Sequence, residues 1–84
     1  MRYRVILPKS VQKALNRLPD DTTNRILARL AALETNPRPP DVKKLKGRNG
    51  WRIRIGDYRV IYEINDSALQ VLVIIAGHRR EVYQ

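Results

Sequence analysis

The segment from position 43 to position 59, KKLKGRNGWRIRIGDYR, decides how this chain folds. Along WRIRI, at positions 51–55, apolar and basic residues alternate, which is the period-two pattern of a strand with one buried face and one wet face. Gly56 and Asp57 fit a two-residue hairpin turn, and YRVIYEI, at positions 58–64, has the pattern of the returning strand. The sequence therefore predicts a β-hairpin at the centre of the protein.

A two-residue loop also fixes the register of this hairpin. Ile55 would pair with Tyr58, and each pair further from the turn follows in step; side chains directly opposite share a face. The predicted buried face is apolar and carries Trp51, Ile53, Ile55, Tyr58, Val60 and Tyr62. The predicted outer face carries Arg52, Arg54 and Arg59.

This outer face is unfavourable for the fold by itself. It sets Arg54 opposite Arg59, and like charges directly opposite destabilise a sheet by up to about 1 kcal/mol per pair. One interpretation is that a polyanion lies across the face when the protein works. The alternative is a solvated face whose arginines extend into water.

The composition indicates a positively charged domain that binds a partner. The 84 residues predict a single domain, 1–84, and 43% of them are hydrophobic, which excludes a disordered chain. The net charge is +9, and the basic residues are mostly arginine, whose planar fork suits phosphate oxygens. These features point to nucleic acid, an acidic protein partner, or both.

Several classes of protein are excluded or disfavoured. The chain has no cysteine, so it can form neither a disulfide framework nor a thiolate metal site, and its one histidine, His78, excludes a multi-histidine zinc site. We therefore expect no metal and no cofactor. The N-terminus lacks the pattern of a signal peptide, and no apolar run approaches the length of a membrane span. We expect a cytoplasmic protein with no membrane partner.

The first half of the chain predicts a strand and two helices. Positions 2–7 alternate like a strand, and positions 9–18 place apolar residues at helical spacing. Pro19 ends that helix, and the segment Asp20-Asp21-Thr22-Thr23 predicts an N-cap and favourable negative charge for a second helix. So few residues separate the two that they must form an antiparallel hairpin.

The second half completes a sheet. The proline-rich segment at positions 36–40 is a stiff connector, and Asn65-Asp66-Ser67 predicts a turn after the central hairpin. Positions 68–76 form an almost continuous apolar run, which predicts a strand buried on both faces. The order β-α-α-β-β-β predicts an α+β fold, a mostly antiparallel four-stranded sheet with a helical hairpin packed on one face.

Other basic residues have less specific patterns. Those on the polar side of the helices, Arg17, Arg25 and Arg29, are interpreted as solvating charge. A second group precedes the central hairpin in a loop or at a strand edge: Lys43, Lys44, Lys46 and Arg48. They are either phosphate contacts that bind RNA without sequence choice, or charges that only aid solubility.

The chain resembles the RelE/ParE superfamily of type II toxins, and its RelE branch in particular. The resemblance covers nearly the whole chain and rests on the strand-helix-helix opening, KKLKG, WRIRIGDYRVIYEI and the final VLVIIAGHRREVY. It implies a RelE-like microbial ribonuclease fold. It also implies an mRNA interferase that cuts the codon in the ribosomal A site and is neutralised by a RelB-like antitoxin in a hetero-oligomer.

The resemblance also implies site residues. By motif position they are Arg52, Arg54, Arg59, Arg79 and Tyr83. ParE-like relatives poison DNA gyrase and generally lack the arginine-and-tyrosine tail, so its presence here favours the ribonuclease. Two alternatives stay open: a ParE-type gyrase inhibitor, and an inactive module that only binds RNA or an antitoxin.

Cleavage by the RNA's own 2′-hydroxyl needs a base, cations around the phosphate and an acid for the leaving oxygen, and it requires no metal. Arginine stabilises charge well but is a poor base. RelE relatives often carry lysines where this chain has Arg52 and Arg54, which removes the natural lysine base. The candidates are then Tyr83, with a pKa lowered by nearby arginines, and His78. The tail stops one residue after Tyr83, so we expect the C-terminal helix of longer relatives to be missing.

Overall fold

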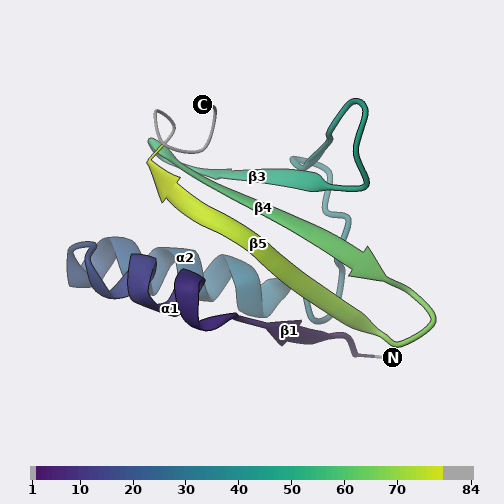
Figure 1. The fold of residues 1–84 in the computed structure, drawn as a ribbon, viewed down its shortest axis with the longest axis horizontal. Coiled ribbons are helices and arrows are strands. Elements are labelled where there is room, and N and C mark those ends of the chain that lie inside the picture. Colours follow the sequence, from purple (N-terminus) through teal and green to yellow (C-terminus); the bar gives the residue numbers. More distant parts are fainter. Residues whose placement is uncertain (1, 79–84) are drawn as a thin grey trace.

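The computed structural model describes residues 2–78, which form a mixed five-stranded sheet with two helices on one face (Figure 1). The elements in chain order are β1 (Arg4–Ile6), α1 (Lys9–Asn16), α2 (Asp20–Ala32), β2 (Lys43–Lys44), β3 (Trp51–Ile55), β4 (Tyr58–Asn65) and β5 (Gln70–His78). The strand order is β1-β5-β4-β3-β2; β1 runs parallel to β5, and the other neighbours are antiparallel. The predicted α+β fold with a helical hairpin on one face is therefore confirmed.

The sheet has one strand more than the sequence predicted. The additional strand, β2, is only two residues long and pairs with the start of β3 at the edge of the sheet. Two residues cannot show an alternating pattern, so periodicity could not have found this strand.

The central hairpin has the predicted register. The pairs run from Ile55↔Tyr58 beside the turn to Trp51↔Tyr62 at the far end. Gly56 has a φ of 61°, a value that glycine adopts without steric cost and that suits the first position of a two-residue hairpin loop.

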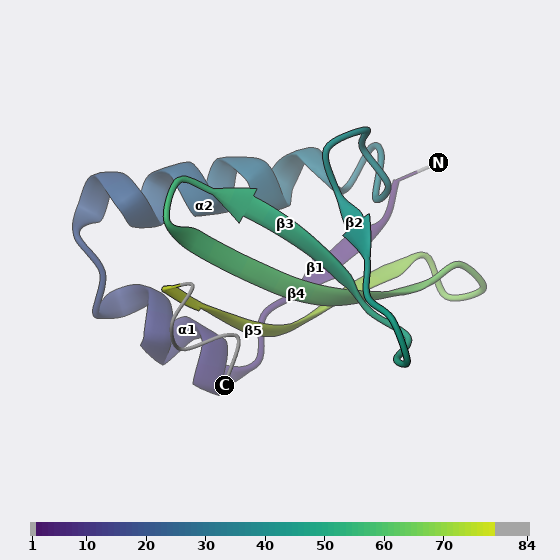
Figure 2. The ribbon, with the colours of Figure 1, turned by 90° about the horizontal axis from the view of Figure 1, so that it is seen from above.

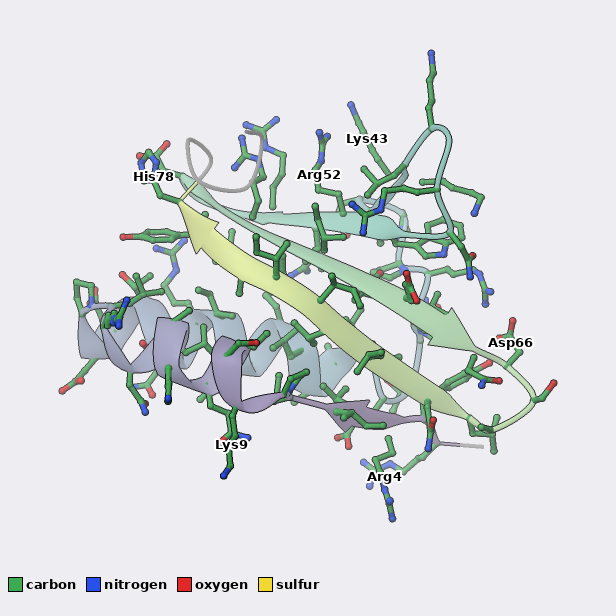
Figure 3. The ribbon with its side chains drawn as sticks, in the orientation of Figure 1. Arg4, Lys9, Lys43, Arg52, Asp66 and His78 are labelled. Atoms are coloured by element: carbon green, nitrogen blue, oxygen red, sulfur yellow. The ribbon has the colours of Figure 1, made fainter. Side chains whose placement is uncertain are left out.

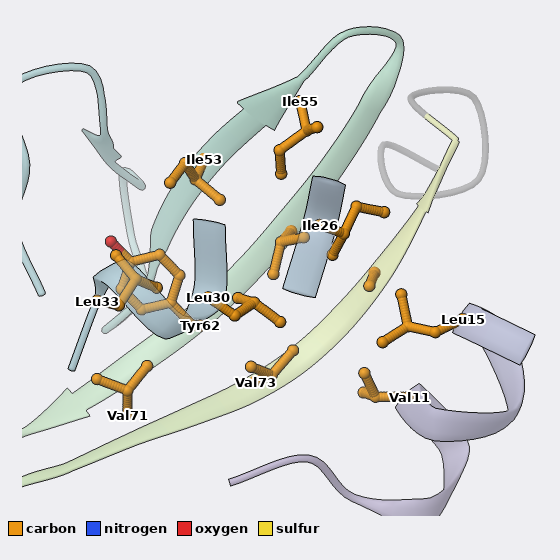
Figure 4. Packing of buried hydrophobic residues seen from close by; sticks show 12 residues of the cluster. Val11, Leu15, Ile26, Leu30, Leu33, Ile53, Ile55, Tyr62, Val71 and Val73 are labelled. Atoms are coloured by element: carbon orange, nitrogen blue, oxygen red, sulfur yellow. The ribbon is translucent and has the colours of Figure 1, made fainter. Parts of the chain in front are cut away.

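The hydrophobic core lies between the helices and the inner face of the sheet (Figure 4). Its buried members are Val11, Leu15, Ile26, Leu30, Leu33, Ile53, Ile55, Val60, Tyr62, Val71, Val73 and Ala76. The predicted inner face of the hairpin is confirmed, with Trp51 and Tyr58 partly buried at its two ends. Each fully buried aliphatic side chain contributes about 1.5–3 kcal/mol, so this one layer supplies most of the stability.

The prediction that the last strand is buried on both faces is wrong. Leu72, Ile74 and Ile75 are 37%, 36% and 38% exposed, because the helices cover only the inner face of the sheet (Figure 1). The register between β4 and β5 also shifts, from Ile61↔Ile75 to Tyr62↔Val73. Ile74 is thus the extra residue of a β-bulge. It is apolar although it does not occupy a buried position.

The helices begin at prolines rather than at polar caps. Pro8 and Pro19 occupy the N-cap positions, and neither supplies a side-chain hydrogen bond, so the predicted cap from Asp20–Thr23 is wrong. The hydroxyl of Thr23 donates instead to the carbonyl of Leu15, at 2.7 Å, and joins α2 to α1. The first helix ends at Asn16, two residues before its predicted end. Neither described helix has the length and apolar composition needed to cross a bilayer.

The connector between α2 and β2 is held to the sheet by one buried hydrogen bond. The hydroxyl of Tyr62, a fully buried residue of β4, donates to the carbonyl of Pro37 at 2.7 Å. Burial raises the pKa of Tyr62 to about 12, so the hydroxyl keeps its proton and stays a donor. This bond ties the connector to β4 at Pro37.

We predict that Tyr62→Phe lowers the free energy of unfolding by about 1–2 kcal/mol, because it leaves the Pro37 carbonyl buried without a donor. Denaturant titration measures the change. The matched control is Tyr58→Phe, since the Tyr58 hydroxyl makes no hydrogen bond within residues 2–78 and its loss should change little. Equal stability of the two variants would show that the Pro37 carbonyl is satisfied in another way.

Candidate functional site

Basic side chains from three strands lie together on the outer face of the sheet, which neither described helix covers. The register places Arg52, Arg54 and Arg59 on this side, and Lys43 joins them because it pairs directly with Arg52. Figure 3 shows Arg52 and Lys43 pointing away from the helices. We call these four residues, contributed by β2, β3 and β4, the basic face.

Arg59 is not a solvated side chain. It is only 6% exposed, and its Nη1 donates to the carbonyls of Gly56 and Tyr58, both at 3.1 Å. Its partner on β5 is Gly77, which has no side chain to occupy the space above the strand. The interpretation of the outer arginines as side chains splayed into water is wrong for Arg59. Its guanidinium is a cation held in a fixed position by the backbone of the turn.

The remaining arginines of the basic face differ in exposure. Arg52 is half-buried beside Ile61, its buried partner on β4, whereas Arg54 is exposed. Arg54 lies directly opposite Arg59, as the sequence predicted. The face therefore combines one fixed guanidinium with an exposed one across a single strand pair.

His78 is the last residue of β5, at the end of the sheet where the β3–β4 turn lies (Figure 3). It pairs with Tyr58, and the two rings make an edge-to-face contact with centroids 5.7 Å apart. Its neighbour Gly77 pairs with Arg59. The other predicted tail residues, Arg79 and Tyr83, lie outside the described residues.

The second predicted group of basic residues lies along the edge of the sheet. Lys43 and Lys44 form β2, while Lys46 and Arg48 are exposed in the following loop, which a hydrogen bond of 2.9 Å from Leu45 N to the carbonyl of Gly50 closes. The predicted location, a loop or strand edge, is confirmed. Lys43 faces outward with Arg52, whereas Lys44 shares a face with Trp51.

Trp51 is contacted by two cations. The guanidinium of Arg38 lies 5.4 Å from the ring centroid, and the Nζ of Lys44 lies 5.1 Å from it. Each such contact contributes about 0.5–1 kcal/mol at a partly exposed ring. Trp51 is therefore a packing residue at the rim of the core whose exposed surface is taken up by charged side chains.

Asp66 positions Arg38 for this stack. Its carboxylate accepts two hydrogen bonds from Arg38, at 2.9 and 3.2 Å, and one from the Tyr3 hydroxyl at 2.6 Å. The hydrogen bonds from Arg38 and then Tyr3 lower the pKa of Asp66 to about 2. This exposed cluster joins β1, the connector and the turn before β5.

Sequence reasoning missed one part of the positively charged surface. Arg25 and Arg29 of α2 were interpreted as solvating charge, but with Arg54 they line a pocket of about 420 Å³ beside the end of β3. Figure 2, seen from above, shows α2 running alongside the free edge of β3. Residues so far apart in the sequence give no local pattern that could have revealed this grouping.

Comparison with known proteins identifies relatives over most of the chain. Residues 5–83 match the family described as ParE toxin of type II toxin–antitoxin system, parDE. A protein of Methanocaldococcus jannaschii described as a candidate toxin RelE1 is 37% identical over 68 residues, which cover 76% of each chain. Toxin RelE3 of the same organism is 29% identical over 85 residues, which cover 95% of this chain and 94% of the relative.

A solved structure with the same fold agrees with these matches. A chain in the crystal structure of the archaeal RelE–RelB complex from Pyrococcus horikoshii superimposes with a TM-score of 0.84 at 39% sequence identity. The match covers 94% of this chain and 97% of that chain.

We predict that the contribution of Asp66 to stability disappears in acid. Its folded-state pKa of about 2 lies below its ordinary value of 3.8, so this stabilisation is complete above about pH 4 and is lost as the pH falls towards 2. The difference in thermal midpoint between the wild type and Asp66→Asn should shrink over that interval. The control is Asp57→Asn, which removes a carboxylate that forms no ion pair within residues 2–78. If the difference in thermal midpoint between the wild type and Asp66→Asn did not change with pH, the lowered pKa of Asp66 would be contradicted.

We predict that Arg54→Thr raises the free energy of unfolding by a few tenths to about 1 kcal/mol, because it removes the like charge opposite Arg59. Thermal unfolding at low salt measures the gain, which should diminish at high salt as the repulsion is screened. Arg48→Thr is the matched control, since it removes the same charge from an exposed loop. A clear fall in the midpoint of the Arg54 variant would mean that Arg54 supports the fold.

Proposed function

We propose, since this chain belongs to the ParE toxin family of type II toxin–antitoxin systems, that it is a RelE-like endoribonuclease toxin that cleaves mRNA in the ribosomal A site. Such a toxin inhibits translation and works in the cytoplasm, where its ribosomes are. The RelE proteins at 37% and 39% identity support the RelE branch of the superfamily.

The observation that carries this proposal is the basic face. Lys43, Arg52, Arg54 and Arg59 converge on the one side of the sheet that the helices leave uncovered. A flat surface of this kind suits an extended single strand, whose phosphates require cations at intervals. Arginine adds geometric fit, because its fork donates two parallel hydrogen bonds to a phosphate.

In the proposed reaction the 2′-oxygen of the RNA attacks the adjacent phosphorus and the bond to the 5′-oxygen breaks. A base removes the 2′ proton, and an acid gives a proton to the departing 5′-oxygen, so the products are a 2′,3′-cyclic phosphate and a 5′-hydroxyl end. Arg54 and Arg59 stabilise the negative charge that grows on the phosphate oxygens, and Arg52 holds the strand beside them. Arg79 adds a further cation in this proposal. No step requires a metal.

Fixed orientation is the property that makes Arg59 suitable for this role. Its guanidinium is held by two backbone carbonyls, so little reorganisation accompanies charge formation in the transition state. Arg54 is exposed and can follow the substrate as it enters. In this proposal Arg59 therefore stabilises the charge of the transition state, and Arg54 captures the RNA strand.

The base is Tyr83 or His78 by sequence, and we propose Tyr83. His78 is half-buried with its ring against Tyr58, whereas a base must reach the 2′-hydroxyl of the bound strand. Surrounding arginines would lower the pKa of a tyrosine near the phosphate and make it a better proton acceptor.

We also propose an antitoxin partner and a ribosomal one. The Pyrococcus horikoshii structure is a complex of RelE with RelB, and by analogy this chain would bind a RelB-like antitoxin in a hetero-oligomer. A protein with a net charge of +9 fits both an acidic antitoxin and ribosomal RNA. In this proposal Lys44, Lys46 and Arg48 contact ribosomal RNA, while Lys43 belongs to the basic face.

A gyrase inhibitor is the second candidate, because the matching family is named for ParE. It predicts inhibition of DNA supercoiling and no cleavage of RNA. An inactive antitoxin-binding module predicts neither activity.

The decisive experiment is cleavage of an mRNA by the purified protein, with and without programmed ribosomes, mapped by primer extension. We expect cuts inside the A-site codon only when ribosomes are present. If neither tube contains cuts, the ribonuclease proposal fails, and a supercoiling assay with gyrase then decides between the two remaining candidates.

We predict that Tyr83→Phe slows cleavage by about a hundredfold or more in single-turnover reactions on ribosomes, as expected for loss of a general base. Tyr3→Phe, which removes a hydroxyl that binds Asp66 far from the basic face, is the matched control and should keep the wild-type rate. His78→Gln should stay within a few-fold of the wild type. A large loss in the His78 variant, with Tyr83→Phe unaffected, would reverse the assignment of the base.

A further inference from the structure

The pocket beside the end of β3 is lined by three guanidinium groups from two elements. Arg25 and Arg29 reach it from α2 and Arg54 from β3, around a volume of about 420 Å³. Its lining residues come from α2, β3 and the β3–β4 turn, and Figure 2 shows α2 passing near that turn. We call it the edge pocket.

The edge pocket has an excess of positive charge. Its one carboxylate, Asp41, forms an ion pair with Arg29. Arg25 and Arg54 form no ion pair within residues 2–78. Two of the three cations are therefore available to an anion, while the third is held in place by Asp41.

The backbone at this edge contributes a further donor. The short strand β2 pairs only with Trp51 and Arg52, so the rest of this edge of β3 has no neighbouring strand among residues 2–78. In an antiparallel hairpin, alternate residues direct their N–H and C=O groups away from the partner strand. The Gly50 carbonyl accepts from Leu45 on the β2 side, so Arg54, four residues on, directs its N–H to the same open side.

Arg25 lies beside the β3–β4 turn at one side of the pocket. A side-chain carbon placed on Gly56 would lie 3.6 Å from one terminal nitrogen of Arg25 and 4.0 Å from the other, so the guanidinium lies against the turn. The turn that sets the register of the hairpin thus also forms part of the wall of the pocket, with a cation from α2 beside it.

We propose that the edge pocket binds a backbone phosphate of the RNA strand that lies on the basic face. Arg54 belongs to both sites, so one strand can run over the edge of the sheet, with one phosphate on the basic face and a neighbouring one between Arg25 and Arg54. The identity of the strand as substrate rests on the proposed ribonuclease function. The ability of the guanidinium groups in the pocket to hold a phosphate diester does not depend on that function.

The test measures binding without cleavage. The probe is a fluorescent 2′-O-methyl RNA of about ten nucleotides, which has no free 2′-hydroxyl to attack phosphorus. Anisotropy titrations over a range of salt concentrations give the slope of log K against log salt for the wild type, Arg25→Gln and Arg17→Gln. Arg17 is exposed at the end of α1, away from the edge pocket, so its variant is the matched control for loss of one charge.

We expect Arg25→Gln to weaken binding several-fold and to make the slope shallower by about 0.7, the value for one phosphate of a single strand. Arg17→Gln should keep the wild-type slope. Equal slopes for the two variants would overturn the proposal. A loss seen only with a base-paired RNA duplex would also overturn it, because the pocket would then bind folded RNA rather than the strand on the basic face.

The result is independent of catalysis. If ribosomes and mRNA give no cleavage but Arg25→Gln changes the salt slope, the ribonuclease proposal fails and the phosphate site stands. If cleavage occurs and the slope is unchanged, the phosphate site fails alone. Thermal unfolding of both variants confirms that each is folded.

Discussion

The two-residue turn at Gly56-Asp57 is the constraint on which the rest of the structure depends. It makes Ile55 and Tyr58 a pair, and every pair along β3 and β4 follows from it up to Trp51 and Tyr62. A slip of one residue would move each side chain of one strand to the other face, so that guanidinium groups would enter the core and isoleucines would meet water. The register of this hairpin thus determines both which side chains enter the core and which side chains form the basic face.

The same register has a cost in stability. Arg54 and Arg59 lie directly opposite each other, and Arg59 is buried as well, with its Nε lacking a hydrogen bond within residues 2–78. Neither feature helps the fold, because facing like charges and orphaned buried donors both raise its free energy. Departures from local stability rules concentrate at functional sites, and here two of them fall on one residue pair. The buried core on the other side of the sheet tolerates this cost.

Sequence predicted what depends on local periodicity and failed where tertiary packing decides. The hairpin register, both helices and the α+β class followed from spacing, and a two-residue loop leaves little choice of pairing. The apolar run of β5 was misinterpreted because hydrophobicity gives no information on which face a helix will cover; Leu72, Ile74 and Ile75 remain exposed. The burial of Arg59 could not be predicted either, because its partner on β5, Gly77, is set only by the β4–β5 register.

The charges along the open edge of β3 also have a purely structural explanation. An unpaired strand edge invites pairing with other chains, and natural proteins protect such edges with charged side chains. That requirement is met by any exposed charge, and Arg54 alone would satisfy it. It does not require Arg25 to lie against Gly56, nor Asp41 to hold Arg29 at the same pocket. The arrangement therefore exceeds what edge protection needs. A positioned set of guanidinium groups, beside a backbone N–H that no described strand pairs with, suits the recognition of a phosphate that we propose.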